Sequence, residues 1–251
     1  MYRSLTIPAA CFTLAAALGA CAADNGDEGI FVTKNVAASA SCTFTADEGA
    51  AFLSHGTYSI HATTSYALHP QMVSRVTASA GQQEARTIIM RGARVNLRIP
   101  DETVLSAAQQ ESLRASGVMK FSALFTAPLP PNGGIATGEL DVITPALLDQ
   151  IVMAKGAGIL AADAPSFRTE VIASVVVYGD MSGSEITSQE FQFPITICND
   201  CVVNELGACP LPAGTVPRPG NACNPFQDGS ADCCRLNDEV ICPATVAAAA
   251  Q

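Results

Sequence analysis

Cysteine is the residue type in this chain whose number and spacing most clearly indicate chemistry. The sequence has 251 residues and ten cysteines, seven of them downstream of residue 197 and two of these adjacent, at positions 233 and 234. Such a set could coordinate a metal ion, exchange thiols with a partner, or form structural disulfides. The choice depends on the compartment, because disulfides persist where the surroundings are oxidising.

The N-terminus predicts export. Arg3 precedes an apolar stretch that ends in small residues, which is the composition of a signal peptide over residues 1–20. The letters LGAC at 18–21 resemble the lipobox of bacterial lipoproteins, which implies cleavage before Cys21 and diacylation of its sulfur. An ordinary signal peptide cut near Ala22 is the alternative.

The predicted lipid on Cys21 gives the protein its expected partner, a membrane. Two alanines follow this cysteine, and by resemblance to lipoprotein sorting signals they favour the outer membrane, with the protein on the periplasmic or cell-surface face. Residues 21–40 are expected to form a lipidated flexible tether, because "AADNGDEG" is short and polar. Acyl chains would anchor a domain that lacks a spanning segment.

Eight cysteines remain once Cys11 leaves with the signal peptide and Cys21 carries lipid, and we expect them to form disulfides. They are Cys42, Cys198, Cys201, Cys209, Cys223, Cys233, Cys234 and Cys242. Complete pairing requires Cys42 to reach the C-terminal region, and Cys198 or Cys201 is the expected partner. Cys233 and Cys234 should bond to different partners, because neighbouring Cα atoms about 3.8 Å apart are closer than an unstrained disulfide prefers.

Cys198-Asn-Asp-Cys201 also has the spacing of zinc sites and of redox pairs. No second Cys-x-x-Cys and no nearby histidine completes a zinc set. A redox pair needs its first cysteine at a helix N-terminus, and the segment that follows is too rich in Pro and Gly for that helix. Disulfides are therefore predicted, with no metal and no cofactor, and thiol-disulfide exchange by Cys198 and Cys201 is retained as a third hypothesis.

Three histidines, His55, His61 and His69, fall within fifteen residues. On one extended strand, which rises about 3.3 Å per residue, His61 and His69 would lie roughly 26 Å apart. We therefore expect exposed histidines on the polar face of a strand, not metal ligands. The sequence contains neither a G-x-S-x-G nor an H-E-x-x-H motif, and no catalytic residue is predicted.

Strands dominate the elements that would position these residues. Apolar and polar residues alternate over 57–69, 94–99 and 121–125. A β-branched run over 170–178 and an alternating run over 190–198 flank a turn-rich stretch, as in a hairpin. Pro194 predicts an edge or a bulge on the second of these strands.

Two short helices connect the strands. Ser106 and Gln109 form a capping-box pattern, and Thr144 precedes Pro145 at the start of an apolar stripe that ends at Gly156. The predicted fold is all-β, an immunoglobulin- or fibronectin-like β-sandwich over 41–197 with a small disulfide-stapled tail over 198–251.

The C-terminal third resembles a known group of sequences. The stretch "VVVYGDMSGSEITSQEFQFPITICNDCVV", followed by "CNPFQDGSADCC", is similar to the end of lipoproteins predicted from myxobacterial genomes. Those proteins share the lipobox, a β-rich middle and a Cys-rich end. The family has no assigned activity, so the resemblance implies no catalytic residue.

Charge and composition narrow the expected function. The formal net charge is −10 and no block of Lys and Arg occurs, which argues against nucleic acid as a partner. The leading hypothesis is a lipid-anchored envelope protein that binds, adheres or supports without catalysis, with an envelope protein or an extracellular ligand as its partner. An exported hydrolase-like enzyme is the alternative, because catalytic groups can converge from distant segments.

Overall fold

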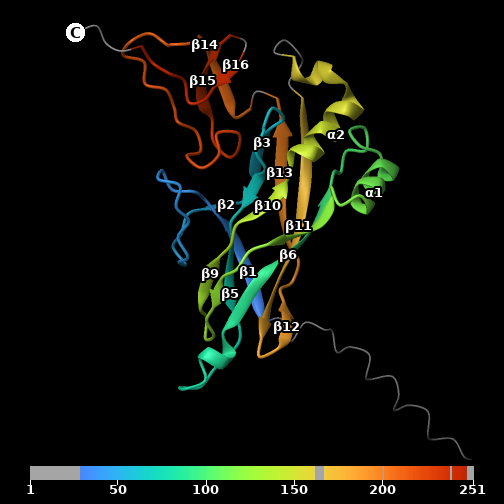
Figure 1. Cartoon of the computed structure of the whole chain (residues 1–251), viewed down its shortest axis with the longest axis vertical. Coiled ribbons are helices and arrows are strands. Elements are labelled where there is room, and N and C mark those ends of the chain that lie inside the picture. The colour runs from blue at the N-terminus through green and yellow to red at the C-terminus, as the bar shows by residue number, and fades with distance from the viewer. Residues whose placement is uncertain (1–28, 162–166, 200, 238, 248–251) are drawn as a thin grey trace, which may run out of the picture.

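The computed structural model describes residues 29–161, 167–199, 201–237 and 239–247 (Figure 1). The predicted signal peptide over 1–20 and the predicted lipidation site Cys21 lie outside these ranges. Strands predominate in the described chain, so the predicted all-β, sandwich-like fold is confirmed. No helix in these ranges is both long enough and apolar enough to cross a membrane.

The largest sheet has the strand order β3-β13-β11-β6-β7, with β12 and β8 paired at the ends of its long strands. Its pairs are antiparallel except for β3 and β13, which run parallel. The bounds are β3 Gly56–Ser59, β6 Ile88–Arg98, β7 Lys120–Leu124, β8 Pro128–Leu129, β11 Arg168–Met181, β12 Ser184–Thr187 and β13 Phe191–Cys198.

Two smaller sheets complete the body of the protein. One has the order β2-β1-β5-β9 and the other pairs β10 with β4. The bounds are β1 Ile30–Val36, β2 Phe52–Leu53, β4 Tyr66–Leu68, β5 Pro70–Ser74, β9 Ile135–Thr137 and β10 Leu140–Ile143. Buried side chains from all three sheets, such as Val32, Leu68 and Val95, meet in one continuous apolar core.

Alternation along the long strands explains that core. In β6 the side chains of Val95 and Leu97 are buried while Arg94, Asn96 and Arg98 are exposed, as the sequence predicted. The same period of two buries every second residue of β11 from Val171 to Val177. The predicted hairpin is also present, since β11 pairs with both β12 and β13.

Pro194 of β13 lies where the strand has a free edge. It pairs with Ile172 of β11 on one side, and pairing with β3 on the other side begins only at Ile195. Proline has no N–H to donate to a ladder, so a strand accepts it where one side is unpaired. The edge predicted from Pro194 is therefore present locally.

The single strand predicted over 57–69 is wrong. β3 ends at Ser59, a turn closes with a hydrogen bond from Ala62 N to Ser59 O, and β4 begins at Tyr66 in another sheet. The alternating sequence pattern continues across the turn because the chain on both sides of it buries side chains in the same core, among them those of Tyr58 and Leu68.

The boundary of the predicted tether is also wrong. Residues 30–36, which we assigned to a flexible segment ending at 40, form β1 and pair with β2 and β5. Ile30, Val32 and Val36 are buried, so the folded body begins before residue 41. The polar composition that suggested a tether ends at Gly29.

Both predicted helices are confirmed. Helix α1, Ala107–Ala115, begins with the capping box of Ser106 and Gln109. Helix α2, Pro145–Lys155, has Thr144 at its N-cap and ends at Gly156, whose φ of 86° is readily adopted by glycine. Two 3-10 turns, Glu84–Arg86 and Ala157–Leu160, complete the helical elements of the described ranges.

The tail forms a small sheet of its own with the order β14-β15-β16, at one end of the molecule (orange to red in Figure 1). The bounds are β14 Val203–Ala208, β15 Ala231–Leu236 and β16 Glu239–Ile241. Its buried cluster contains only Leu211, Cys234 and Ala244. So few apolar residues make a core that depends on covalent bridges.

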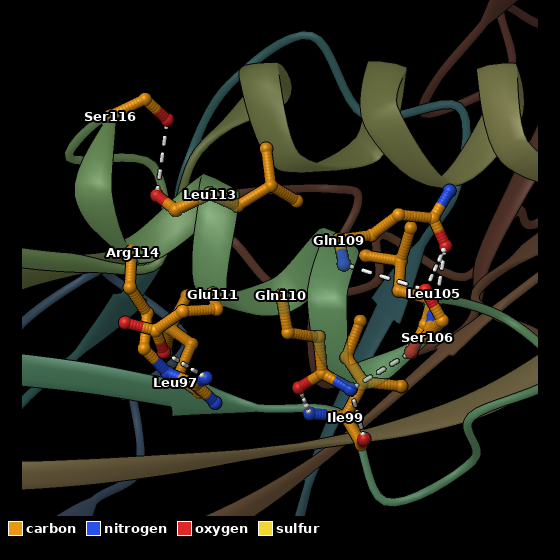
Figure 2. Close-up of polar contacts among 10 residues, drawn as sticks. All are labelled: Leu97, Ile99, Leu105, Ser106, Gln109, Gln110, Glu111, Leu113, Arg114 and Ser116. Atoms are coloured by element: carbon orange, nitrogen blue, oxygen red, sulfur yellow. Dashed lines mark hydrogen bonds and ion pairs between the residues drawn. The ribbon is translucent and has the colours of Figure 1, made fainter.

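Gln110 fixes α1 to the sandwich (Figure 2). This side chain is 4% exposed, its Nε2 donates to Ile99 O at 2.8 Å and to Leu105 O at 2.9 Å, and its Oε1 accepts from Ile99 N at 3.1 Å. One amide therefore satisfies three backbone groups that follow the end of β6.

We expect Gln110→Leu to lower the free energy of unfolding by about 2–4 kcal/mol, because it leaves those backbone groups buried without partners. Urea denaturation followed by circular dichroism measures this change. The matched control on the same helix is Glu111→Gln, which removes only an exposed ion pair with Arg114 and should cost less than about 0.5 kcal/mol. Equal losses in the two variants would contradict the role of Gln110.

Candidate functional site

The candidate site is a cavity of about 600 Å³ between the sandwich and the tail. Four segments line it: the loop between β1 and β2 at 42–44, the chain at 64–69, the start of β10 at 139–141, and residues 223–227. We call it the bridge pocket, because the Cys42–Cys223 disulfide lies in its wall. Its volume is in the range of small-molecule sites.

Residues 226–228 of the tail build one wall by pairing with the open edge of β3. Ser59 N donates to Phe226 O and Asp228 N donates to Thr57 O, both at 2.9 Å. Strand β13 occupies the other edge of β3, so residues 226–228 add a short extended segment to the outer edge of the sheet.

The side chain of Gln227 joins the same segment to β4. Its Oε1 accepts from Ala67 N at 3.0 Å and its Nε2 donates to Ala67 O at 3.2 Å, as the backbone of a neighbouring strand would. Because Gln227 is 4% exposed, its side-chain amide has little access to water, and its polar atoms are satisfied by the backbone of Ala67 instead.

Asp228 anchors the end of the segment. Its carboxylate accepts from Thr57 N at 2.8 Å and from the Tyr66 hydroxyl at 2.7 Å. Burial raises the pKa of Asp228, and these hydrogen bonds oppose the rise. Burial, followed by the charge of Asp228, raises the pKa of Tyr66, so the phenol is held as a hydrogen-bond donor.

The loop between β1 and β2 supplies a further part of the lining. Phe44 stacks on the ring of His69, with centroids 3.4 Å apart and planes 17° apart. Cys42 reaches Cys223 with a Cα–Cα distance of 5.0 Å. The expected bond from Cys42 to Cys198 or Cys201 is therefore wrong, because those two cysteines pair with each other at the end of β13.

His69 is buried, not exposed as predicted. The residue is 6% exposed and lines the pocket, and its ring nitrogens make no hydrogen bond within the described chain. Burial lowers the pKa of His69 to about 4, so the imidazole is neutral near pH 7. The prediction failed because the strand assumed over 57–69 turns a corner.

The other two histidines face different elements. His55 Nε2 lies 3.0 Å from Thr196 Oγ1, and His61 Nε2 lies 2.8 Å from Asn199 Oδ1. Across 29–161, 167–199, 201–237 and 239–247, no group of three or more His, Cys, Asp or Glu residues is placed to hold a metal ion.

The remaining cysteines form three more pairs. They are Cys198–Cys201, Cys209–Cys234 and Cys233–Cys242. Cys233 and Cys234 thus bond to different partners, as predicted. Cys198 is 1% exposed and the strand β14, not a helix, follows the pair. Thiol exchange requires an accessible sulfur with a lowered pKa, and Cys198, the first cysteine of the pair, is buried and is not followed by a helix within the described residues.

The bridge pocket has an acidic rim. Glu139 and Asp141 are exposed, line the cavity and make no ion pair within the part of the chain that the structure describes. No lysine or arginine among the described residues lines the pocket. The site therefore combines two carboxylates, a neutral imidazole and two phenyl rings, those of Phe44 and Phe226.

We expect the paired substitution Cys42→Ser/Cys223→Ser to lower the free energy of unfolding by about 2–5 kcal/mol. The bridge joins residues 181 apart, and a long closed loop restricts the unfolded chain most. Urea denaturation gives the loss, and hydrogen exchange should show faster exchange at Ser59 and Ala67, whose amides bond to the docked segment. Unchanged protection at these two amides would show that the segment docks without the bridge.

His69 should make stability depend on pH. Its pKa is 6.5 in the unfolded chain and about 4 in the folded protein, so the folded state binds fewer protons between these values. The free energy of unfolding should therefore fall as pH decreases through this window, by up to about 3 kcal/mol. Asp228, whose pKa is raised, acts in the opposite direction.

The difference between wild type and His69→Gln isolates the histidine, since Asp228 is present in both. Chemical denaturation at a series of pH values between neutral and 4 measures it. Parallel curves for the two proteins would contradict the lowered pKa.

Comparison with known proteins identifies no relative from which a function could be inferred. No protein-family model matches the chain, and a search of curated proteins finds no significant match. The geometry of the bridge pocket is therefore the observation on which a functional proposal has to rest.

Proposed function

We propose that this protein is an exported, lipid-anchored binding module that presents the bridge pocket to a ligand in the cell envelope. The four disulfides indicate an oxidising compartment, periplasmic or extracellular. The lipobox-like residues 18–21 support an anchor on Cys21, and its sorting to the outer membrane.

The observation that carries the proposal is the cross-linked construction of the pocket. The disulfide Cys42–Cys223 joins the loop between β1 and β2 to the tail, and hydrogen bonds of Gln227 and Asp228 hold the same tail segment on β3 and β4. A cavity fixed before a ligand arrives loses little conformational entropy on binding. Such a pocket, with convergent polar groups, is the usual form of a ligand site.

The chemistry of the lining supports binding more than catalysis. Covalent catalysis pairs a nucleophile with a base, and within the described chain no hydroxyl or thiol of the pocket is hydrogen-bonded to His69. Thr64 Oγ1 donates instead to Asn224 Oδ1 at 3.2 Å, and Cys42 and Cys223 are bonded to each other. No specific contact favours the hydrolase alternative.

The anchor is tested by intact mass of the protein extracted from a bacterial membrane. We expect a diacyl or triacyl adduct on a chain that begins at Cys21, and eight thiols that react with a blocking reagent only after reduction. Cys21→Ser should abolish the adduct and release the protein from the membrane fraction, while Cys11→Ser, the matched control within the signal peptide, should change neither. An unlipidated wild-type chain that begins near Ala22 would overturn the anchor.

A further inference from the structure

The charge of the bridge pocket restricts what it can hold. Glu139 and Asp141 supply two carboxylates at the rim, and no positively charged side chain of the described residues lines the cavity. Neither carboxylate is neutralised by an ion pair within the described ranges. A cation from outside would therefore find two acceptors, whereas an anion would meet like charges on a chain whose net charge is −10.

A second observation, independent of the acidic rim, is that the pocket offers an acceptor to a hydrogen-bond donor on a ligand. The His69 side chain lines the pocket, its residue is only 6% exposed, and its ring nitrogens have no partner in the described chain. Neither ring nitrogen is among the fully buried polar atoms of the described chain that lack a partner, so both remain accessible, and a neutral imidazole offers one acceptor nitrogen to a ligand. An ammonium group carries N–H donors that match this nitrogen and the carboxylates.

The two phenyl rings indicate an apolar body attached to that cation. Phe44, held in place by its stacking on His69, and Phe226, which packs against the core, both line the pocket. The face of an aromatic ring attracts a cation. The same rings also bury apolar surface of a ligand that packs against them. A small inorganic cation would leave most of a cavity of about 600 Å³ unfilled.

We propose that the bridge pocket binds an organic cation, an ammonium group on an apolar body, through Glu139, Asp141 and His69 with Phe44 and Phe226 around the apolar part. This inference rests on the proposed function, since it names the ligand class of the same pocket.

The test compares three probes of one shape and different charge: benzylamine, benzyl alcohol and benzoate. The mature lipidated protein is held in zwitterionic nanodiscs, and empty nanodiscs correct for partition into lipid. Calorimetry should give saturable binding of benzylamine with a Kd of about 1 mM or tighter. Benzyl alcohol should bind about tenfold more weakly, and benzoate should not bind.

Matched variants assign the effect to the pocket. Glu139→Gln/Asp141→Asn should weaken benzylamine binding about tenfold and leave benzyl alcohol unchanged, because only the cation contacts the carboxylates. The control Glu84→Gln/Glu102→Gln makes the same change of net charge at exposed positions outside the pocket, and benzylamine binding should be unaltered.

The outcomes separate this inference from the proposed function. If benzyl alcohol binds as tightly as benzylamine, and Phe44→Ala weakens both, the pocket is a ligand site but the preference for a cation is wrong. Equal losses in the pocket variant and the charge control would also overturn it. If none of the three probes binds saturably, the pocket as a ligand site is overturned, and the binding function with it.

Discussion

The pairing of residues 226–228 with the open edge of β3 is the interaction on which this architecture depends. Without it the largest sheet would end at β3 with unpaired N–H and C=O groups, which is the form of edge that associates with other chains. The contacts of Gln227 with Ala67 and of Asp228 with Thr57 and Tyr66 extend the same pairing to the corner between β3 and β4. The same docking places Cys223 beside Cys42, so the covalent bridge follows from the strand pairing.

Two different sources of stability meet at this junction. The body has a large apolar core contributed by three sheets, whereas the tail buries few apolar residues and contains three of the four bridges. A tail of this kind would gain little from packing alone, because its conformational entropy exceeds what so small a core can offset. The bridge pocket lies between the two parts, so its shape depends on both the core and the bridges.

Local patterns in the sequence predicted the parts of the fold that local physics decides. Alternation identified the buried faces of β6 and β11, and capping residues located α1 and α2, because a period and a cap are set by neighbours in the chain. The corner after Ser59 was not predicted, because the even-numbered residues are buried on both sides of it and the alternation continues unbroken. Strand β1 was not predicted, because it directly follows a polar run. The partner of Cys42 and the pocket could not be predicted, since both require segments up to 181 residues apart to meet.

The early start of β1 changes how the proposed anchor would hold the protein. With lipid on Cys21 and the folded body beginning at Ile30, residues 22–29 span at most roughly 28 Å, from about 3.3–3.6 Å per residue. The twenty-residue tether expected from composition would have allowed a much longer reach. With the proposed anchor, a link of this length would keep the folded body close to the lipid surface, and the pocket would meet ligands there. The proposed anchor and the proposed ligand class are thus compatible, because a disulfide-braced pocket held near the membrane would meet amphiphilic ligands at its surface.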